Sequence, residues 1–214
     1  MSRPRVAVAF HGFLRTGAAM WWLARRLRAA GFAEVVSPTI GYHLRGVEQN
    51  AEVAAQAVRG LMERHPGADL HLVSHSYGGV LARVAWARHD LPPLKRGVLL
   101  APPNRGAQAA DLARGVVPVH RAGWDPLGQM RPGVPSHWPL PAGEIGILAG
   151  GTGTERGINP LLGADNDGTV RVDEAFHEDA VEFRVIPMHH SVILLSPRAL
   201  DRVVHFLDHG RFGE

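Results

Sequence analysis

The chain has 214 residues, of which 45% are hydrophobic and 20% are charged, and its formal net charge is +3. These values are typical of a soluble globular protein and predict one domain, residues 1–214, with a full hydrophobic core. Cysteine is absent from the sequence, which excludes disulfides and thiolate catalysis. The arginines are scattered rather than clustered, so we expect no nucleic-acid surface.

The amino-terminal segment runs from a short apolar stretch, residues 5–10, directly into a histidine and a glycine. This stretch is too short for the core of a signal peptide, and nothing in the chain approaches the ~18 apolar residues of a membrane span. We therefore expect a cytoplasmic protein with no signal peptide and no transmembrane segment. The sequence leaves its oligomeric state open.

Apolar runs that predict strands alternate with helical patterns along the chain. The expected strands cover residues 5–10, 33–38, 69–74, 96–102, 144–150 and 181–187. Helical spacing of apolar residues predicts helices over residues 17–31, from Val47 to just before Pro66, after residue 76, and over residues 197–209. Ser196 is placed to cap the last helix and Gly210 to end it. This alternation predicts an α/β fold, with a mostly parallel central sheet and helices on both faces.

One segment, residues 116–141, breaks this alternation because it is dense in proline. Proline at that density excludes long helices and central strands, and a long irregular stretch inside a compact domain is usually functional. We interpret the segment as a small cap or lid. Trp124 and Trp138 within it are candidate substrate-facing aromatics, and the alternative is that both only anchor the segment to the body.

A strand-to-helix joint carries the first candidate catalytic residue. The stretch LHLVSHSYGGVLAR reads as a buried strand followed by a helix, with Ser76 at the joint. So sharp a turn holds a nucleophile at the carboxyl edge of a sheet, and it needs small residues two positions before and two after the nucleophile. Ser74 and Gly78 meet this requirement, with serine in place of the first glycine. Ser76 is the expected nucleophile, and a plain helix N-cap is its alternative role.

A nucleophilic serine needs a base, and the base needs a carboxylate that orients it. In proteins with this kind of turn, the carboxylate and then the histidine follow the serine along the chain. We select Asp167 because the Asp-Gly pair there follows a strand and its loop; the rival carboxylates are Asp165, Asp173 and Glu174. Two alternatives remain for this stretch. One is a plain Asp-Gly turn, and the other is a calcium loop, which lacks its first ligand and carries Arg171 at a ligand position.

The candidate base comes from the stretch between the last expected strand and the last helix. His189 and His190 lie there, just past the strand end, where the last loop of such a sheet presents its histidine. We prefer His190 to His189, partly on the resemblance described below. Since the base must be neutral to accept a proton, activity should rise with pH as the histidine deprotonates.

Two backbone N–H groups are expected to stabilise an oxyanion at this edge of the sheet. Tyr77 follows the nucleophile directly, and Phe13 lies in the loop after the first strand. Other residues at the same edge, or in the proline-rich segment, are candidates for the substrate pocket. They are His11, Gly12, His75, Trp124 and Trp138.

These motifs resemble those of the α/β-hydrolase family, and the chain looks most like its small bacterial esterases and compact lipases with little or no cap. The resemblance spans nearly the whole chain and rests on VAVAFHGFLRTGAAMWWLARRL, LHLVSHSYGGVLAR, GVLLAPPNRGA, NPLLGADNDGTV and HHSVILLSPRALDRVVHFLDHGRF. It implies an α/β-hydrolase fold, with Asp167 before Gly168 as the acid and His190 before SVILL as the base. The chain departs from the family pattern at Ser74 and in the proline-rich segment.

The expected function is that of a serine hydrolase that cleaves carboxylic esters of small molecules or lipids through an acyl-enzyme. Alternatives are an acyltransferase that uses the same acyl-enzyme, a non-catalytic binding protein on the same fold, and a cofactor-free lyase or peroxidase. We expect no metal and no organic cofactor. His205 and His209 have the spacing of a ligand pair without a third ligand, and GGTGTERG is not followed by the helix that a dinucleotide site requires.

Overall fold

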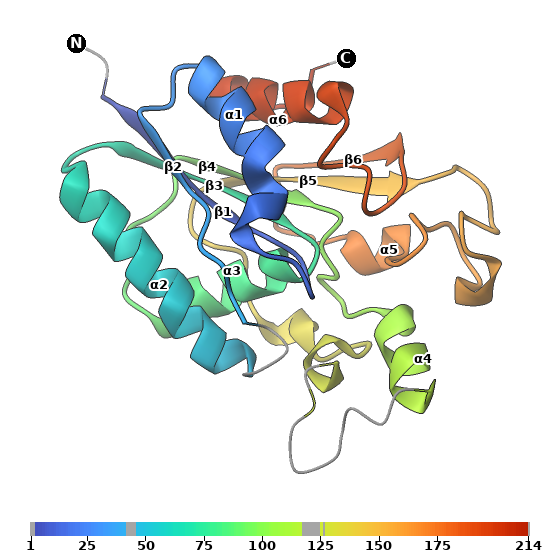
Figure 1. The fold of residues 1–214 in the computed structure, drawn as a ribbon. Coiled ribbons are helices and arrows are strands. Elements are labelled where there is room, and N and C mark those ends of the chain that lie inside the picture. The colour runs from blue at the N-terminus through green and yellow to red at the C-terminus, as the bar shows by residue number, and fades with distance from the viewer. Residues whose placement is uncertain (1–2, 42–45, 117–124, 126, 214) are drawn as a thin grey trace.

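The computed structural model describes residues 3–41, 46–116, 125 and 127–213 (Figure 1). Its centre is a six-stranded sheet with the strand order β2-β1-β3-β4-β5-β6, in which every neighbouring pair is parallel. The strands are β1 (Arg5–Phe10), β2 (Glu34–Val36), β3 (Asp69–His75), β4 (Arg96–Leu100), β5 (Glu144–Gly151) and β6 (Glu182–Pro187). The predicted α/β class is confirmed, and the sheet is parallel throughout rather than mostly parallel.

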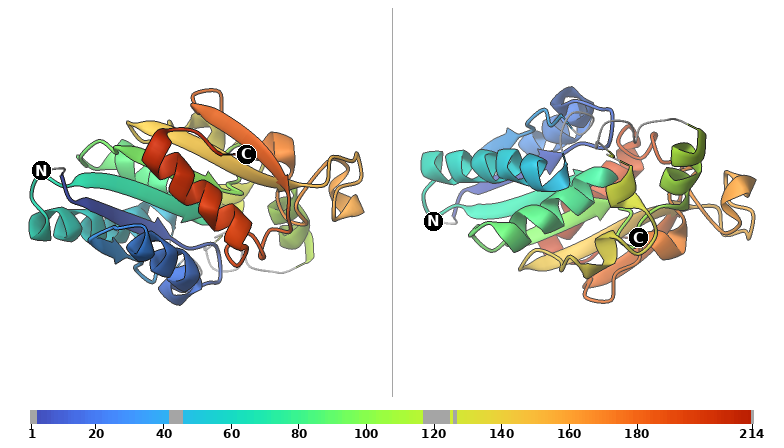
Figure 2. Two further views of the ribbon diagram at one scale, coloured as in Figure 1. Left: turned by 90° about the horizontal axis from the view of Figure 1, so that it is seen from above. Right: turned by 90° about the horizontal axis from the view of Figure 1, so that it is seen from below.

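Helices cover both faces of the sheet, as expected (Figures 1 and 2). One face carries α1 (Trp21–Ala29) and α6 (Pro197–His209), and the other carries α2 (Val47–Arg64) and α3 (Tyr77–Arg88). The residues of β1 alternate between two cores: Val6 and Val8 pack towards α2 and α3, whereas Ala7 packs towards α1 and α6. Burial on both faces explains why the strands read as continuous apolar runs. None of the described helices combines the length and the apolar character needed to cross a bilayer.

The ends of the first and last helices show how local sequence sets the elements. The Ser196 side chain accepts a hydrogen bond from the Ala199 N–H at 3.3 Å, and Gly210 ends α6 in the left-handed conformation, as expected from the sequence. The helix expected over residues 17–31 is instead a 3-10 turn, Gly17–Met20, followed by α1. A Cβ on Gly17 would lie 2.1 Å from the Ser37 carbonyl oxygen, so glycine is required where the chain enters this turn.

Two α-helices, α4 (Gln108–Val116) and α5 (Val172–Ala175), were not expected from the sequence. Val116, the first residue of the proline-rich segment, is the last residue of α4. The rest of the described part of the segment holds two single-turn 3-10 helices, Gly128–Met130 and Pro135–His137, and neither an α-helix nor a strand. Backbone hydrogen bonds tie this part to the loop after β4, from Ala107 N–H to the Met130 carbonyl and from the Gly133 N–H to the Arg105 carbonyl, both 2.7 Å. Residues 117–124 and 126, which include Trp124, lie outside the described residues.

Candidate active site

The turn from β3 into α3 holds Ser76 in an unusual backbone conformation. Its φ of 55° and ψ of −129° lie in a region that residues other than glycine rarely adopt. The Ser76 N–H donates to the Leu100 carbonyl at 2.8 Å, which fixes the turn against β4. A Cβ on Gly78 would lie 2.5 Å from the Phe10 carbonyl oxygen, so only glycine fits there. Ser74, the departure from the usual motif, is fully buried, and its hydroxyl has no hydrogen-bond partner among the described residues.

The structure brings Ser76, His190 and Asp167 into one hydrogen-bonded chain. The Ser76 Oγ lies 2.9 Å from His190 Nε2, and Asp167 Oδ2 lies 2.7 Å from His190 Nδ1. With its hydrogen on Nδ1, the imidazole donates to the carboxylate and accepts from the serine hydroxyl. All three side chains are buried, and Ser76, the most accessible, is 9% exposed. The loops after β3, β5 and β6 thus converge at the carboxyl edge of the sheet.

Asp167 is held by more than its contact with the histidine. Its Oδ1 accepts hydrogen bonds from the Thr169 N–H at 3.0 Å and the Val170 N–H at 2.8 Å, and its backbone carbonyl accepts from the His190 N–H at 2.9 Å. Backbone N–H groups therefore orient the Asp167 carboxylate in addition to its hydrogen bond with His190. The neighbouring His189 is exposed, and its Nδ1 accepts from the Ser191 N–H rather than facing Ser76.

Two of the rival carboxylates considered from the sequence, Asp165 and Glu174, accept hydrogen bonds from backbone N–H groups of nearby loops and helix ends. Asp165 accepts hydrogen bonds from the N–H groups of Thr152 and Gly153, and Glu174 accepts from those of Arg171 and Gln108. Among the described residues, no three or more His, Cys, Asp or Glu side chains gather as a metal site would require.

His75 takes a different position from the pocket wall that the sequence suggested. Its Nε2–H donates to the backbone carbonyl of His190 at 2.9 Å, and the two imidazole rings lie 4.8 Å apart. Burial, and secondly the neighbouring His190, lower the pKa of His75 to about 3, so the ring is neutral at physiological pH. The neutral, buried His75 ring thus fixes the backbone carbonyl of His190, the candidate base, by a hydrogen bond.

The loop after β1 packs closely against the turn at Ser76. A Cβ on Gly12 would lie 3.1 Å from the Ser76 Cβ, so the backbone of this loop passes directly beside the serine. His11 Nε2 accepts from the Ile40 N–H at 2.9 Å, which leaves its Nδ1–H to donate to the Gly12 carbonyl at 2.9 Å. Burial lowers the pKa of His11, in keeping with a neutral ring that shapes the loop. Within the described residues, the Phe13 N–H that follows has no hydrogen-bond acceptor.

An apolar cavity of about 370 Å³ opens beside Ser76. Phe13 and the α4 alanines form much of its wall; the lining residues are Phe13, Leu14, Ser76, Pro103, Ala107, Ala109, Ala110, Ala113, Leu127, Met130, Thr169 and Val170. The sequence did not single out α4 as a pocket element. His11, Gly12, His75 and Trp138 are not among the described residues that line this cavity, and Trp124 lies outside the described residues.

Trp138 instead contacts α3. Its backbone carbonyl accepts a hydrogen bond from the buried Arg83 guanidinium, and the Arg88 guanidinium lies 4.9 Å from the centre of its ring. Arg83 also donates to the Asn104 carbonyl at 2.8 Å. These contacts attach the carboxyl end of the proline-rich segment to the body of the protein.

Comparison with solved structures identifies this architecture. The mature Bacillus licheniformis lipase BlEst2 matches with a TM-score of 0.76 over 98% of this chain and 93% of that protein, at 19% identity. Phospholipase PlaB from Legionella pneumophila matches with a TM-score of 0.68 over 95% of this chain and 60% of PlaB, at 17% identity. The metagenomic carboxyl esterase MGS0156 matches with a TM-score of 0.65 over 99% of this chain and 73% of the esterase, at 17% identity.

The chain has the α/β-hydrolase fold. No protein-family model matches the sequence, and no curated protein sequence matches it significantly. In the α/β-hydrolase fold a nucleophile sits on the turn between a strand and a helix, with the acid and the histidine later in the chain. Ser76, Asp167 and His190 follow one another in this order along the chain, and their side chains are hydrogen-bonded at the carboxyl edge of the sheet.

Proposed function

We propose that the protein is a serine hydrolase that cleaves carboxylic esters, with Ser76 as nucleophile, His190 as general base and Asp167 as the orienting acid. The observation that carries this proposal is the continuous hydrogen-bonded chain from Asp167 through His190 to the Ser76 hydroxyl, at a strained strand-to-helix turn. The solved structures of similar fold include a lipase, a phospholipase and a carboxyl esterase, which supports the same reaction class.

The first half of the reaction forms the acyl-enzyme. The Ser76 Oγ attacks the ester carbonyl while His190 Nε2 takes the hydroxyl proton. Asp167 accepts from Nδ1–H, so it holds the tautomer that leaves Nε2 free to act and stabilises the imidazolium that forms. The N–H groups of Phe13 and Tyr77 would donate to the oxyanion. His190 then passes the proton to the departing alcohol.

The second half releases the acid. Water takes the place of the alcohol, gives its proton to His190 Nε2 and attacks the acyl carbonyl. The tetrahedral intermediate then collapses, the bond to Ser76 Oγ breaks, and His190 returns the proton to Ser76 Oγ as the acid leaves. The apolar cavity of about 370 Å³ lies at the small end of ligand pockets, which favours an uncharged acyl group of modest size.

The test is a series of nitrophenyl esters of increasing acyl length, assayed with the wild-type protein and with Ser76→Ala and His189→Ala. We expect hydrolysis by the wild type, loss of it in Ser76→Ala, and near wild-type turnover in His189→Ala, because His189 does not face the serine. An exposed histidine one residue from the candidate base is a matched control for the loop. Equal hydrolysis by wild type and Ser76→Ala would contradict the proposal.

A further inference from the structure

Helix α1 presents a water-facing surface of unusual composition. Its exposed residues are Trp21, Trp22, Arg25, Arg26, Arg28 and Ala29, so every exposed position is tryptophan, arginine or alanine. The exposed face of α2, by contrast, mixes Glu48, Gln49, Gln56, Arg59, Glu63 and Arg64. Trp21 and Trp22 are each 51% exposed, and their rings pack edge to face at 4.6 Å. Two large aromatic side chains are therefore held half out of the protein on a surface that carries no acidic residue of its own.

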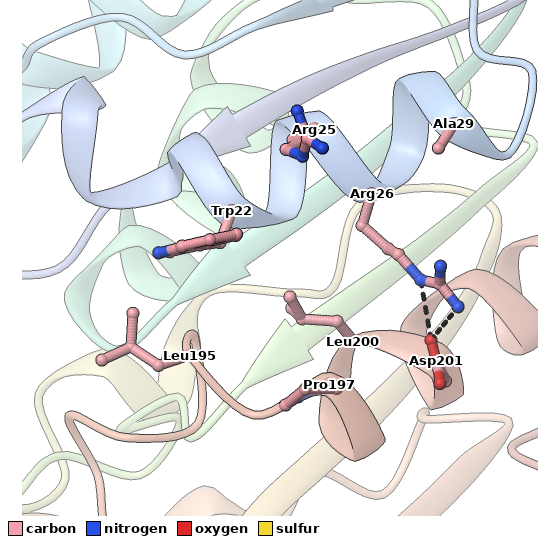
Figure 3. Close-up of a pocket in the computed structure, with 8 residues that line it drawn as sticks. All are labelled: Trp22, Arg25, Arg26, Ala29, Leu195, Pro197, Leu200 and Asp201. Carbon is pink, nitrogen blue, oxygen red and sulfur yellow. Dashed lines mark hydrogen bonds and ion pairs between the residues drawn. The ribbon is translucent and has the colours of Figure 1, made fainter.

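The aromatic face of α1 continues into a groove between α1 and α6 (Figure 3). Trp22 lies on one side of this groove of about 440 Å³, and Leu195, 58% exposed, lies on the other. A second hollow shares both residues and reaches Arg15 and the buried His75 behind the candidate base. Arg15 follows Leu14, which is 70% exposed and lines the cavity at Ser76. Exposed apolar groups thus run from the α1–α6 groove to the rim of the candidate active site.

The positive charge on this surface is incompletely neutralised. Arg26 is ion-paired with Asp201 of α6 (Figure 3). Within the part of the chain that the structure describes, neither Arg15 nor Arg25 has a carboxylate partner; Arg15 donates to the Ser191 hydroxyl, and the Arg25 guanidinium lies 5.9 Å from the Trp21 ring centre. A surface that combines half-exposed tryptophan, leucine and unpaired arginine has the composition of a protein face at a lipid headgroup boundary. Its charge complements an anionic lipid surface.

We propose that the surface formed by Leu14, Arg15, Trp21, Trp22, Arg25 and Leu195 docks the protein on an anionic lipid bilayer. Tryptophan rings sit at the headgroup level, where their apolar body and polar N–H are both accommodated, and arginine pairs with lipid phosphate. The helix lies in the plane of the interface rather than across it, since α1 has only nine residues. Docking in this way brings Leu14, which also lines the cavity at Ser76, to the lipid.

The experiment is co-sedimentation with vesicles of phosphatidylcholine alone and of phosphatidylcholine with phosphatidylglycerol, at low ionic strength. The protein carries Ser76→Ala so that no lipid is consumed, which makes the result independent of whether Ser76 is reactive. We expect binding to the anionic vesicles, weak or no binding to the neutral ones, and release by added salt. Arg25→Gln should weaken binding about fivefold, Arg15→Gln by a similar factor, and Trp22→Ala should weaken it further.

Matched controls replace exposed residues elsewhere on the chain: Arg59→Gln on α2 and Val181→Ala just before β6. Both control variants should bind anionic vesicles as strongly as the Ser76→Ala protein without further substitutions. Circular dichroism of each variant shows whether weaker binding reflects the altered surface residue or unfolding of the protein. The proposal is overturned if the protein stays in the supernatant with anionic vesicles, or if the test and control variants bind alike. It is also overturned if the protein is a dimer that does not bind vesicles and Trp22→Ala makes it monomeric in analytical ultracentrifugation. The surface would then be an interface with a second copy of the chain.

Discussion

Replacing the buried His71 by leucine should make the folded protein less sensitive to acid. His71 lies on β3 with 1% of its surface exposed, and its ring packs edge to face on Phe32 at 5.1 Å. Neither ring nitrogen has a hydrogen-bond partner among the described residues. Burial, reinforced by the charge of Arg5, lowers the pKa of His71 from 6.5 to about 4. The folded protein therefore keeps this ring neutral over a pH range in which the unfolded chain protonates it.

The sign and size of the effect follow from this difference in pKa. Because the unfolded state binds the proton more readily, the stability due to a neutral His71 is intact above pH 6.5 and is lost as the pH falls towards 4. Between about pH 8 and about pH 5 the loss from His71 is about 2 kcal/mol. His75, with its pKa lowered to about 3, adds a similar loss of the same sign. His71→Leu should therefore lose about 2 kcal/mol less stability than the wild type over this interval.

Urea unfolding followed by circular dichroism at both pH values measures this difference. At the higher pH His71→Leu should be near wild-type stability, because leucine fills a similar volume and removes two unpaired polar atoms from the core. The exposed His137→Gln is the control, and it should keep the wild-type pH dependence because its ring meets water in both states. Equal losses of unfolding free energy in His71→Leu and the wild type between the two pH values would show that His71 does not contribute to the acid sensitivity.

Three further predictions concern the candidate active site. Asp167→Asn should lower kcat for ester hydrolysis by about 10⁴-fold, because the amide no longer holds His190 in the acting tautomer; a change below tenfold in steady-state kinetics would argue against the assignment. His75→Phe should lower kcat about tenfold with little change in KM, since it removes the donor to the His190 carbonyl, and His75→Gln should recover part of the loss. An unchanged kcat in His75→Phe would show that the His190 backbone does not need the hydrogen bond from His75. Ala113→Leu should shift the preference towards shorter esters by narrowing the cavity, at about fourfold in kcat/KM for each methylene excluded. An unchanged chain-length profile would place the acyl group elsewhere.

Strand positions were predictable from the sequence because a parallel sheet buried on both faces produces short, continuous apolar runs. All six expected strands are present, and β1 matches its expected bounds. The turn at Ser76 was also predictable, since Gly78 is required by a close backbone approach that leaves a clear local signature. Helix α4 was not, because its cavity-facing residues are mostly alanine, which marks a helix face weakly.

Side-chain direction was the part of the site that sequence could not give. His75 and Trp138 were candidates for the substrate pocket because of their positions along the chain, with anchoring to the body as the alternative for Trp138. The His75 ring turns to the His190 carbonyl, and the Trp138 ring packs against Arg88. The choice between His189 and His190 likewise depends on which imidazole the loop turns inward, and adjacent residues give no local signal for that. Once the loops after β3, β5 and β6 are in place, the 2.9 Å contact with Ser76 Oγ distinguishes them.

Covalent labelling would show whether Ser76 is an activated nucleophile. The protein is incubated with a fluorophosphonate probe, its intact mass is recorded, and the adduct is mapped by peptide sequencing, with Ser76→Ala treated in parallel. We expect a single adduct on Ser76 that is absent from the variant, because the hydrogen-bonded histidine makes this hydroxyl reactive. A folded protein that gains no mass, or that carries the adduct on another serine, would contradict this expectation.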